Sequence, residues 1–312
     1  MARPARNPAI PARDGLSPSC VALPATGPAC PWPRMADFLA ERLPALGREE
    51  WLERMARGEV LDEQGREVAP EAAYEGGQRL YYWRHLPHED RIPFEARIVH
   101  RDGHLLVVDK PHFLPVTPTG RFVRETLLVR LKQATGIDTL SPVHRIDRET
   151  AGLVVFSIRP QDRGAYQALF RERRVDKQYE AIAPSAGAWA GPCVRRSRIV
   201  EDTQAFYRMV EAGGEPNSET AIELLERRGP WARYRLAPVT GRRHQLRVHM
   251  NALGLPICGD QFYPVVRRGP GEPEDYADPL RLLARALAFT DPVTGQFRRF
   301  ESGLGLDWPE PA

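Results

Sequence analysis

Lysine is nearly absent from the sequence. Among the 44 basic residues of the 312-residue chain, only Lys110, Lys132 and Lys177 are lysines, so almost all of the positive charge comes from arginine. The planar guanidinium group of arginine suits bidentate binding of phosphate. A genome that favours arginine codons gives the same count, and we consider that origin the more frequent one. Composition alone therefore does not decide whether the chain binds nucleic acid.

Cysteines are few and dispersed. Cys20, Cys30, Cys193 and Cys258 form no pair with the spacing of a zinc site, and we expect a reduced, cytoplasmic protein. Long apolar runs are also missing, because no stretch approaches the roughly 18 consecutive apolar residues that a transmembrane helix needs. The beginning of the chain lacks the apolar core of a signal peptide. The sequence thus predicts neither a membrane span nor export.

The order of the segments predicts three parts. Residues 1–34 are rich in proline, alanine and arginine without periodicity, which predicts a disordered leader. Residues 35–85 contain two short helical patterns and then two short apolar runs, which predict two helices and a hairpin in a small α/β module. Residues 95–308 mix strand and helix patterns, and we expect them to form a separate, larger domain.

The larger part predicts an α+β fold. Apolar runs at Leu105–Asp109, Leu153–Ser157 and Lys177–Ile182 are typical of strands. Helical spacing predicts helices at Glu125–Ala134 and Pro160–Arg173, the second of which begins with proline. Because helices and strands do not alternate strictly, we predict a mainly antiparallel mixed sheet.

Asp147 is a candidate for chemistry. It lies between Arg145 and Arg148, just before an apolar strand. Positive neighbours favour the charged form of a carboxylate, which suits a nucleophile or a base better than a general acid. The same spacing is also typical of a solvated turn with ordinary surface ion pairs, and spacing alone favours that interpretation.

A second polar segment predicts a helix that begins at Thr240. Arg243 and Arg247 are four residues apart, which places them on one face of such a helix. His244 and His249 are five residues apart, so they point about 140° away from each other and do not chelate one metal ion easily. We therefore expect no metal site here.

Taken together, these segments resemble the RluA-type RNA pseudouridine synthases. Residues 144–152 (HRIDRETAG) are similar to the catalytic motif of that family, and DKPHFLPVTP precedes them. A strand with the sequence KQY at 177–179 follows, and then come TGRRHQLRVHM and GLPICGDQFY. The resemblance extends over roughly residues 95 to 300 and makes residues 95–308 the catalytic domain.

The chain departs from the family pattern at a few positions. Ile146 and Ala151 stand where the family usually has leucine and serine. His112 and Phe113 replace a small residue and a glycine, and we expect this change to alter a loop near the RNA. Residues 36–84 resemble the small RNA-binding module of a ribosomal protein, although the first helix is short and lysines are sparse.

The resemblance implies that the protein is an isomerase that converts specific uridines of structured RNA to pseudouridine. Ribosomal RNA is favoured as the substrate, and transfer RNA is the second choice. The target uridine leaves the RNA stack, and Asp147 starts cleavage of the bond between ribose and ring nitrogen. The residues do not decide whether the carboxylate attacks the sugar, attacks the ring or removes a sugar proton. No metal or organic cofactor is implied, and we expect a monomer.

The resemblance also assigns roles to residues around Asp147. Tyr179 matches the tyrosine that stacks on the flipped base, although a strand tyrosine is more often a core residue. Arg247 matches the partner that forms an ion pair with the catalytic aspartate. Arg145 is expected to shape the motif loop, whereas His244 and Gln245 either bind substrate or brace the helix. Phosphate contacts are expected from some members of a group of arginines, namely Arg171, Arg173, Arg174, Arg242 and Arg243.

Two other functions stay open at this point. One is an RNA-binding protein that has lost catalysis, and the presence of Asp147, Tyr179 and Arg247 argues against it. The other is a hydrolase that cleaves N-glycosidic bonds, which also needs a carboxylate near a flipped base. Such a hydrolase releases free uracil, whereas isomerisation leaves the mass of the RNA unchanged.

Overall fold

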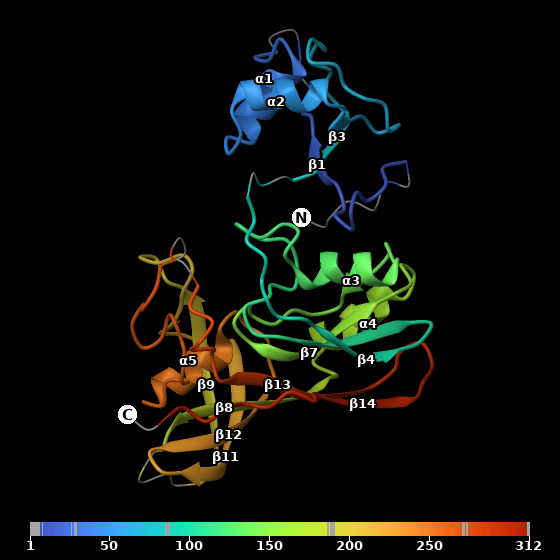
Figure 1. Ribbon diagram of the computed structural model, residues 1–312. Helices are drawn as coiled ribbons and strands as arrows, with labels where there is room; N and C mark the ends of the chain where they lie inside the picture. The colour runs from blue at the N-terminus through green and yellow to red at the C-terminus, as the bar shows by residue number, and fades with distance from the viewer. Residues whose placement is uncertain are drawn as a thin grey trace. The chain divides into compact units, whose positions relative to one another are not determined.

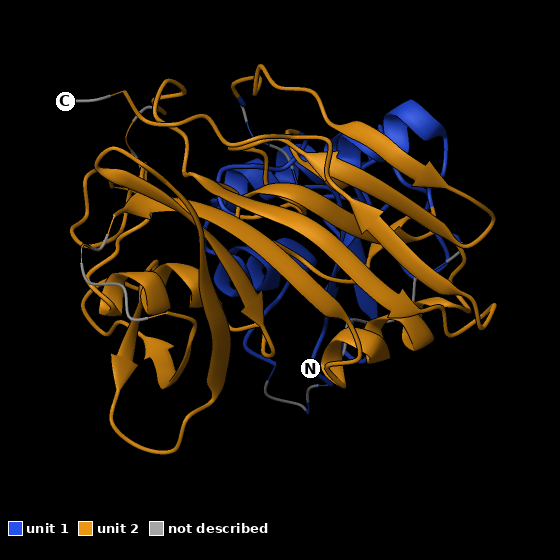
Figure 2. Ribbon diagram, turned by 90° about the horizontal axis from the view of Figure 1, so that it is seen from below, with its two compact units in different colours: residues 1–89, 120–124, 129–138 blue, residues 90–119, 125–128, 139–312 orange. Residues whose placement is uncertain are grey.

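The chain divides into two compact units. The computed structural model describes residues 7, 9–25, 27, 30–84, 86, 88–185, 187, 191–269, 272 and 274–310. Figure 2 colours the first unit, which comprises residues 1–89, 120–124 and 129–138, and the second, which comprises residues 90–119, 125–128 and 139–312. No helix in the described part of the chain is long and apolar enough to cross a membrane.

The first unit contains two helices and a three-stranded sheet. Its sheet has the order β1-β3-β2, with antiparallel pairing throughout. Side chains such as Phe38, Trp51 and Leu80 are at most 1% exposed and form its core. The elements are β1 (Ser19–Ala22), α1 (Met35–Arg42), α2 (Arg48–Ala56), β2 (Val60–Leu61) and β3 (Arg79–Tyr82). The two helices and the β2–β3 hairpin agree with the sequence patterns.

The prediction of a disordered leader is wrong for part of residues 1–34. Ser19–Ala22 form β1, which pairs with β3 in the register Ser19↔Tyr82. Ile10 is also fully buried, in a cluster with Leu61. A four-residue strand among prolines is too short to show a period of two, and only its partner strand stabilises it. Residues 1–6 of the predicted leader lie outside the described residues.

The second unit contains one mixed sheet of 11 strands (Figure 1). Its main order is β10-β9-β11-β12-β8-β13-β7-β5-β4, while β14 pairs with β13 and β6 pairs with β7. The β7–β13 pair is parallel, and the other strand pairs of the described residues are antiparallel. The predicted α+β fold with a mainly antiparallel sheet is therefore confirmed. The strands are β4 (Arg97–Arg101), β5 (Leu105–Lys110), β6 (Ser141–Pro142), β7 (Ala151–Ser157), β8 (Asp176–Pro184), β9 (Cys193–Glu201), β10 (Met209–Ala212), β11 (Ser218–Arg228), β12 (Trp231–Pro238), β13 (Leu282–Thr290) and β14 (Phe297–Glu301).

Gly152 allows two central strands to approach each other closely. Its φ of +106° lies in a region that side chains disfavour, and a Cβ atom there would collide with the backbone of Ala284 on β13. Gly152 pairs with Ala284 in the parallel register of β7 and β13. This contact fixes the strand that directly follows the Asp147 loop.

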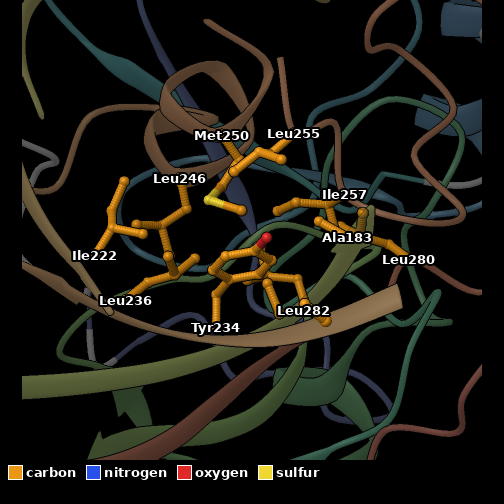
Figure 3. Close-up of a cluster of buried hydrophobic side chains, with 12 residues drawn as sticks. Ala183, Ile222, Tyr234, Leu236, Leu246, Met250, Leu255, Ile257, Leu280 and Leu282 are labelled. Carbon is orange, nitrogen blue, oxygen red and sulfur yellow. The ribbon is translucent and has the colours of Figure 1, made fainter. Parts of the chain in front are cut away.

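Helix α5 (Gln245–Ala252) packs on the sheet through its apolar face. Figure 3 shows Leu246 and Met250 of the helix over Tyr234 and Leu236 of β12. Met250, Tyr234 and Leu236 are fully buried, so the helix is fixed by packing rather than by a side-chain cap. Besides α1, α2 and α5, the described residues form α3 (Leu127–Thr135) and α4 (Arg163–Arg171), and the boundary between the two units passes through α3.

The predicted start of the α5 helix at Thr240 is wrong. The helix begins at Gln245, after His244 in a left-handed conformation with φ of 53°. The Thr240 hydroxyl accepts a hydrogen bond from the backbone N–H of Glu219 instead of capping the helix. Arg243 therefore lies outside the helix and does not share a helical face with Arg247. The competing hydrogen bond comes from β11, which sequence spacing does not reveal.

Candidate active site

Asp147 lies in the loop between β6 and β7, ahead of the strand that Gly152 fixes. Its side chain is 26% exposed. The backbone N–H of Thr150 donates to the carbonyl oxygen of Asp147 at 3.2 Å, which makes the loop turn tightly. The carboxylate therefore combines access to solvent with a backbone position that is held in place.

Arg247 of α5 is the cation that faces Asp147. Its Nη1 lies 3.6 Å from Asp147 Oδ2 and 3.5 Å from Glu149 Oε2. Its Nε and Nη2 donate to the two carboxylate oxygens of Asp260 at 2.8 and 2.7 Å, a bidentate geometry. Burial alone lowers the pKa of Arg247, but Asp260 and the two other carboxylates outweigh it and raise that pKa further above its ordinary value. Arg247 is thus a permanent positive charge.

The Nη1 atom of Arg247 has a special position among these contacts. It is buried and has no hydrogen-bond partner among the described residues. Its distances to Asp147 and Glu149 are those of ion pairs rather than of close hydrogen bonds. The donor therefore points between two carboxylates, one buried and one accessible.

Glu149 forms the buried side of this arrangement. Its side chain is 8% exposed, and Arg148 Nη2 lies 2.8 Å from its Oε1. Burial alone raises the pKa of Glu149, but Arg148 and Arg247 outweigh this effect and lower that pKa to about 2. Arg148 also forms an ion pair with Glu274 at 2.7 Å. Arg148, which follows Asp147 in the sequence, therefore helps to hold the loop in place through Glu149 and Glu274.

Lys110, the last residue of β5, and His112, just after that strand, hold the same loop in place. Lys110 is fully buried, and its Nζ donates to the carbonyl oxygen of Arg148 at 2.9 Å. Burial lowers the pKa of Lys110 to about 7. A ring nitrogen of His112, Nδ1, lies 2.7 Å from the carbonyl oxygen of Glu149 and donates to it. Both contacts hold backbone groups on the C-terminal side of Asp147.

Phe113 occupies the position where the family usually has glycine. Its φ of 66° is left-handed, which costs a side-chain residue on the order of 1 kcal/mol. The ring is 3% exposed and stacks at 5.8 Å on Phe94 and edge-on at 5.1 Å against Tyr276. Apolar packing therefore offsets the backbone strain at Phe113.

Tyr179 lies on β8, in the middle of the sheet. It is partly buried and pairs with Leu236 of β12 and Ala284 of β13. Burial and the negative charge of Asp147 raise the pKa of the Tyr179 hydroxyl, so the phenol is protonated at neutral pH. The fold thus brings Tyr179 into the electrostatic range of Asp147, although the two residues belong to different elements.

Three other predicted site residues differ in their burial and in their contacts. Arg145 is exposed and makes no hydrogen bond or ion pair among the residues that the structure describes. His244 is 7% exposed, and its Nδ1 lies 3.1 Å from the Tyr263 hydroxyl; burial lowers the pKa of His244 to about 4. Gln245 uses both side-chain groups internally, with Nε2 donating to Glu219 O and Oε1 accepting from Thr240. Gln245 therefore braces the fold.

The predicted phosphate-binding arginines are also placed differently from one another. Arg242 and Arg243 donate to backbone carbonyl oxygens, the latter at Phe206 and Tyr207. Arg171 and Arg174 both form ion pairs with Glu172, whereas Arg173 is exposed at a φ of 59°. No group of three or more potential metal ligands occurs within the described ranges.

Asp260 and Glu149 were not predicted from the sequence as partners of Arg247. Both residues stand in segments that the family resemblance had singled out, GLPICGDQFY and HRIDRETAG. A fully buried guanidinium group needs carboxylate partners, and this need is the signal that could have identified the two residues. That signal requires knowledge of the burial of Arg247, which the helical pattern alone does not supply.

Comparisons with known proteins identify the family of the chain. The family described as RNA pseudouridylate synthase matches residues 104–252, which include Asp147, Tyr179 and Arg247. The dual-specificity RNA pseudouridine synthase RluA of Haemophilus influenzae is 32% identical, over 66% of this chain and 91% of that protein. The ribosomal large subunit pseudouridine synthase D of Pasteurella multocida is 28% identical, over 89% of each chain.

A solved structure shows the same fold. The structure of human RNA pseudouridylate synthase domain containing 1 is 25% identical, with a TM-score of 0.55 over 67% of this chain and 83% of that chain. Members of this family are isomerases that convert uridine in RNA to pseudouridine. The chain belongs to the RluA-type family of RNA pseudouridine synthases.

Proposed function

We propose that this protein isomerises specific uridines of ribosomal RNA to pseudouridine and that Asp147 is its catalytic residue. The observation that carries the proposal is the pairing of an accessible carboxylate with a fully buried, permanently charged guanidinium group. Arg247 Nη1 lies 3.6 Å from Asp147 Oδ2, so a fixed positive charge stands beside the carboxylate that solvent can reach. The family membership supplies the reaction, and this geometry supports the assignment of the residue.

The chemistry follows from the order of the bonds. The target uridine leaves the RNA stack, because its glycosidic bond is otherwise out of reach of a side chain. Asp147 begins cleavage of the bond between ribose and ring nitrogen, and the detached uracil turns and rejoins the sugar through carbon. The product has the same atoms as the substrate. No oxidation, phosphoryl transfer or activated water is part of this sequence, and we propose that no metal or organic cofactor takes part.

Tyr179 and Arg247 take supporting roles in this proposal. The ring of Tyr179 offers a face on which the flipped base stacks. We also assign its hydroxyl a part in removing the final proton from the uracil ring. Arg247 orients Asp147 through the contact at Nη1. Arg145, an exposed residue within the motif, approaches the RNA backbone in this proposal. His244 lines the buried side of the site rather than contacting substrate.

Ribosomal RNA is the favoured substrate, with transfer RNA as the alternative. The similarity to the ribosomal large subunit synthase covers 89% of this chain and thus extends into the first unit. The RluA relative is described as having dual specificity, which keeps a second RNA class open. We propose that the protein acts in the cytoplasm as a monomer, because RNA is its substrate and the Asp147–Arg247 contact is made within one chain.

The test is the variant Asp147→Asn, which has nearly the same shape but no charge. We expect pseudouridine formation on ribosomal RNA from cells that lack the protein to fall by roughly a thousandfold or more. RNA affinity and the free energy of unfolding should stay close to those of the parent chain. Pseudouridine is measured by chemical labelling and primer extension.

Asp176→Asn is the matched control, because Asp176 is an exposed aspartate of the same unit. Its turnover should equal that of the parent chain. Normal turnover by Asp147→Asn would remove Asp147 from the catalytic step. Release of free uracil from uridine-labelled RNA, with a matching loss of RNA mass, would instead favour an N-glycosidic hydrolase.

A further inference from the structure

An exposed aromatic residue lies in the loop that joins β9 and β10. Phe206 is 76% exposed, the largest exposed fraction among the large hydrophobic residues of the described chain. Its neighbour Tyr207 is partly buried, and the two rings meet edge-on at 5.5 Å. Single exposed apolar residues are common on protein surfaces, so the contacts of this ring, rather than its exposure alone, indicate a binding surface.

The loop that carries Phe206 is held in place. Arg243 donates from Nη1 to the carbonyl oxygen of Phe206 and from Nη2 to that of Tyr207, both at 2.9 Å. At the base of the loop, Asp202 accepts a hydrogen bond from the N–H of Gln204. Because the backbone on both sides of the ring is bonded, little ordering is left to occur when a ligand binds.

The rings of this loop lead directly to the candidate active site. Tyr207 lies 5.3 Å from Phe262, centroid to centroid. The guanidinium carbon of Arg247 lies 5.1 Å from the centroid of Phe262, and Arg247 is the partner of Asp147. Phe206, Tyr207 and Phe262 thus form a continuous aromatic shelf from solvent to the charged centre. We use the name aromatic shelf for these three residues.

We propose that the aromatic shelf is a second base-binding site, on which an unpaired base near the target uridine stacks on Phe206. The proposal rests on the proposed function, since the RNA must already place its uridine at Asp147. A base presents a flat π face of any sequence, and an aromatic ring accepts it without hydrogen bonding. The exposed residue Arg243, which donates to this loop, supplies positive charge for the adjoining phosphates.

The occupant is a nucleotide rather than a protein segment for reasons of charge and shape. A protein partner needs a contiguous apolar patch, whereas Phe206 stands beside charged residues such as Glu201, Asp202 and Arg243. A single exposed ring with the guanidinium group of Arg243 bonded to its backbone carbonyl matches a base and its phosphate. The contact selects unpaired over paired RNA next to the target, because only an unstacked base exposes its face.

The test compares three variants of the full chain. Phe206→Ala removes the ring, Phe206→Trp keeps a stacking surface, and Phe297→Ala removes an equally exposed phenylalanine (69%) on β14 as the matched control. The probe is a stem–loop RNA whose unpaired loop contains a uridine beside the fluorescent base 2-aminopurine. We expect Phe206→Ala to weaken binding roughly five- to a hundredfold and to abolish the quenching that stacking causes. Phe206→Trp and Phe297→Ala should bind and quench like the parent chain.

Several outcomes overturn the proposal. They are parental affinity in Phe206→Ala, affinity in Phe206→Trp as low as in Phe206→Ala, or an equal loss in Phe297→Ala. Failure here is distinguishable from failure of the proposed function, because binding and quenching do not require turnover and are also measurable with Asp147→Asn. With turnover as the readout, Phe206→Ala should raise KM by the same factor and leave kcat within about twofold of the parent value.

Discussion

The two sides of the Arg247 guanidinium group differ sharply. Toward Asp260, two hydrogen bonds of 2.8 and 2.7 Å join groups that are both fully buried. Toward Asp147, one nitrogen lies 3.6 Å from a carboxylate that is 26% exposed. The same cation is thus a structural brace on one side and an electrostatic neighbour on the other.

This difference shows how a carboxylate can lie beside a cation without forming a close hydrogen bond with it. A bidentate buried pair fixes the plane of the guanidinium, so its free nitrogen has only one direction in which to point. Because that nitrogen makes no close hydrogen bond with Asp147, both oxygens of the carboxylate stay available to the substrate. The contacts of Arg247 with Asp260 and Glu149 therefore stabilise the fold, whereas Asp147 stays accessible to the substrate.

The largest effect on stability is expected from Asp260→Asn. It removes the charge opposite a buried cation, and breaking such a pair costs about 3–5 kcal/mol of the free energy of unfolding. Asp147→Asn should cost less than about 1 kcal/mol, because its carboxylate is partly solvated. Urea denaturation of both variants measures the contrast. Equal destabilisation by the two substitutions would show that the two sides of Arg247 are not different in kind.

A smaller effect is expected from Glu149→Gln. The substitution keeps the shape of the side chain but weakens its charged contacts with Arg148 and Arg247, at a cost of about 2 kcal/mol at neutral pH. Turnover should fall as well, because Arg148 also holds the loop of Asp147 through its backbone. A variant with parental stability would mean that Glu149 contributes nothing to the buried side.

The pH dependence of that cost has a definite sign. Because the folded pKa of Glu149 is about 2 and its ordinary value is 4.5, the unfolded chain binds the proton at the higher pH. Its contribution to stability is fully present above pH 4.5 and is lost as pH falls toward 2. The difference in unfolding free energy between parent and Glu149→Gln should therefore shrink over this range in urea titrations. A constant difference would contradict the ionised, paired state of Glu149.

The smallest effect is expected from Tyr179→Phe, on the accessible side. The ring and its stacking surface remain, so RNA affinity should stay within about twofold of the parent value. Turnover should fall by up to about tenfold, because the hydroxyl that helps to remove the final ring proton is gone. Rapid-quench measurement of pseudouridine separates the two quantities. Unchanged product formation would mean that the hydroxyl has no chemical part.

The sequence located the candidate site better than it explained it. Asp147 and Arg247 were singled out by motif resemblance, and they do contact each other. The arginines on either side of Asp147 do not form ion pairs with it among the described residues: Arg145 is exposed, and Arg148 pairs with Glu149 and Glu274. Neighbours in sequence point in different directions from a turn, so adjacency does not establish an ion pair.

Helix and strand patterns were reliable where burial was one-sided or continuous. β5 and β7 are buried along their whole length and were recognised as apolar runs. β9 alternates between partly buried and exposed residues, several of them arginines, and was not predicted. Its identity as a strand depends on β10 and β11, which lie beside it in the sheet. Such pairing is a property of the fold and leaves little trace in a single segment.

By itself, the sequence determined the fold class, the family motif and the residue types that the reaction needs. The tertiary structure decided which carboxylate Arg247 binds tightly, which one it only faces, and that Arg243 fixes the Phe206 loop. The physical reason is that burial sets the strength of a charge contact. Burial depends on how β7, β8 and α5 pack together, and no local pattern of residues encodes that packing.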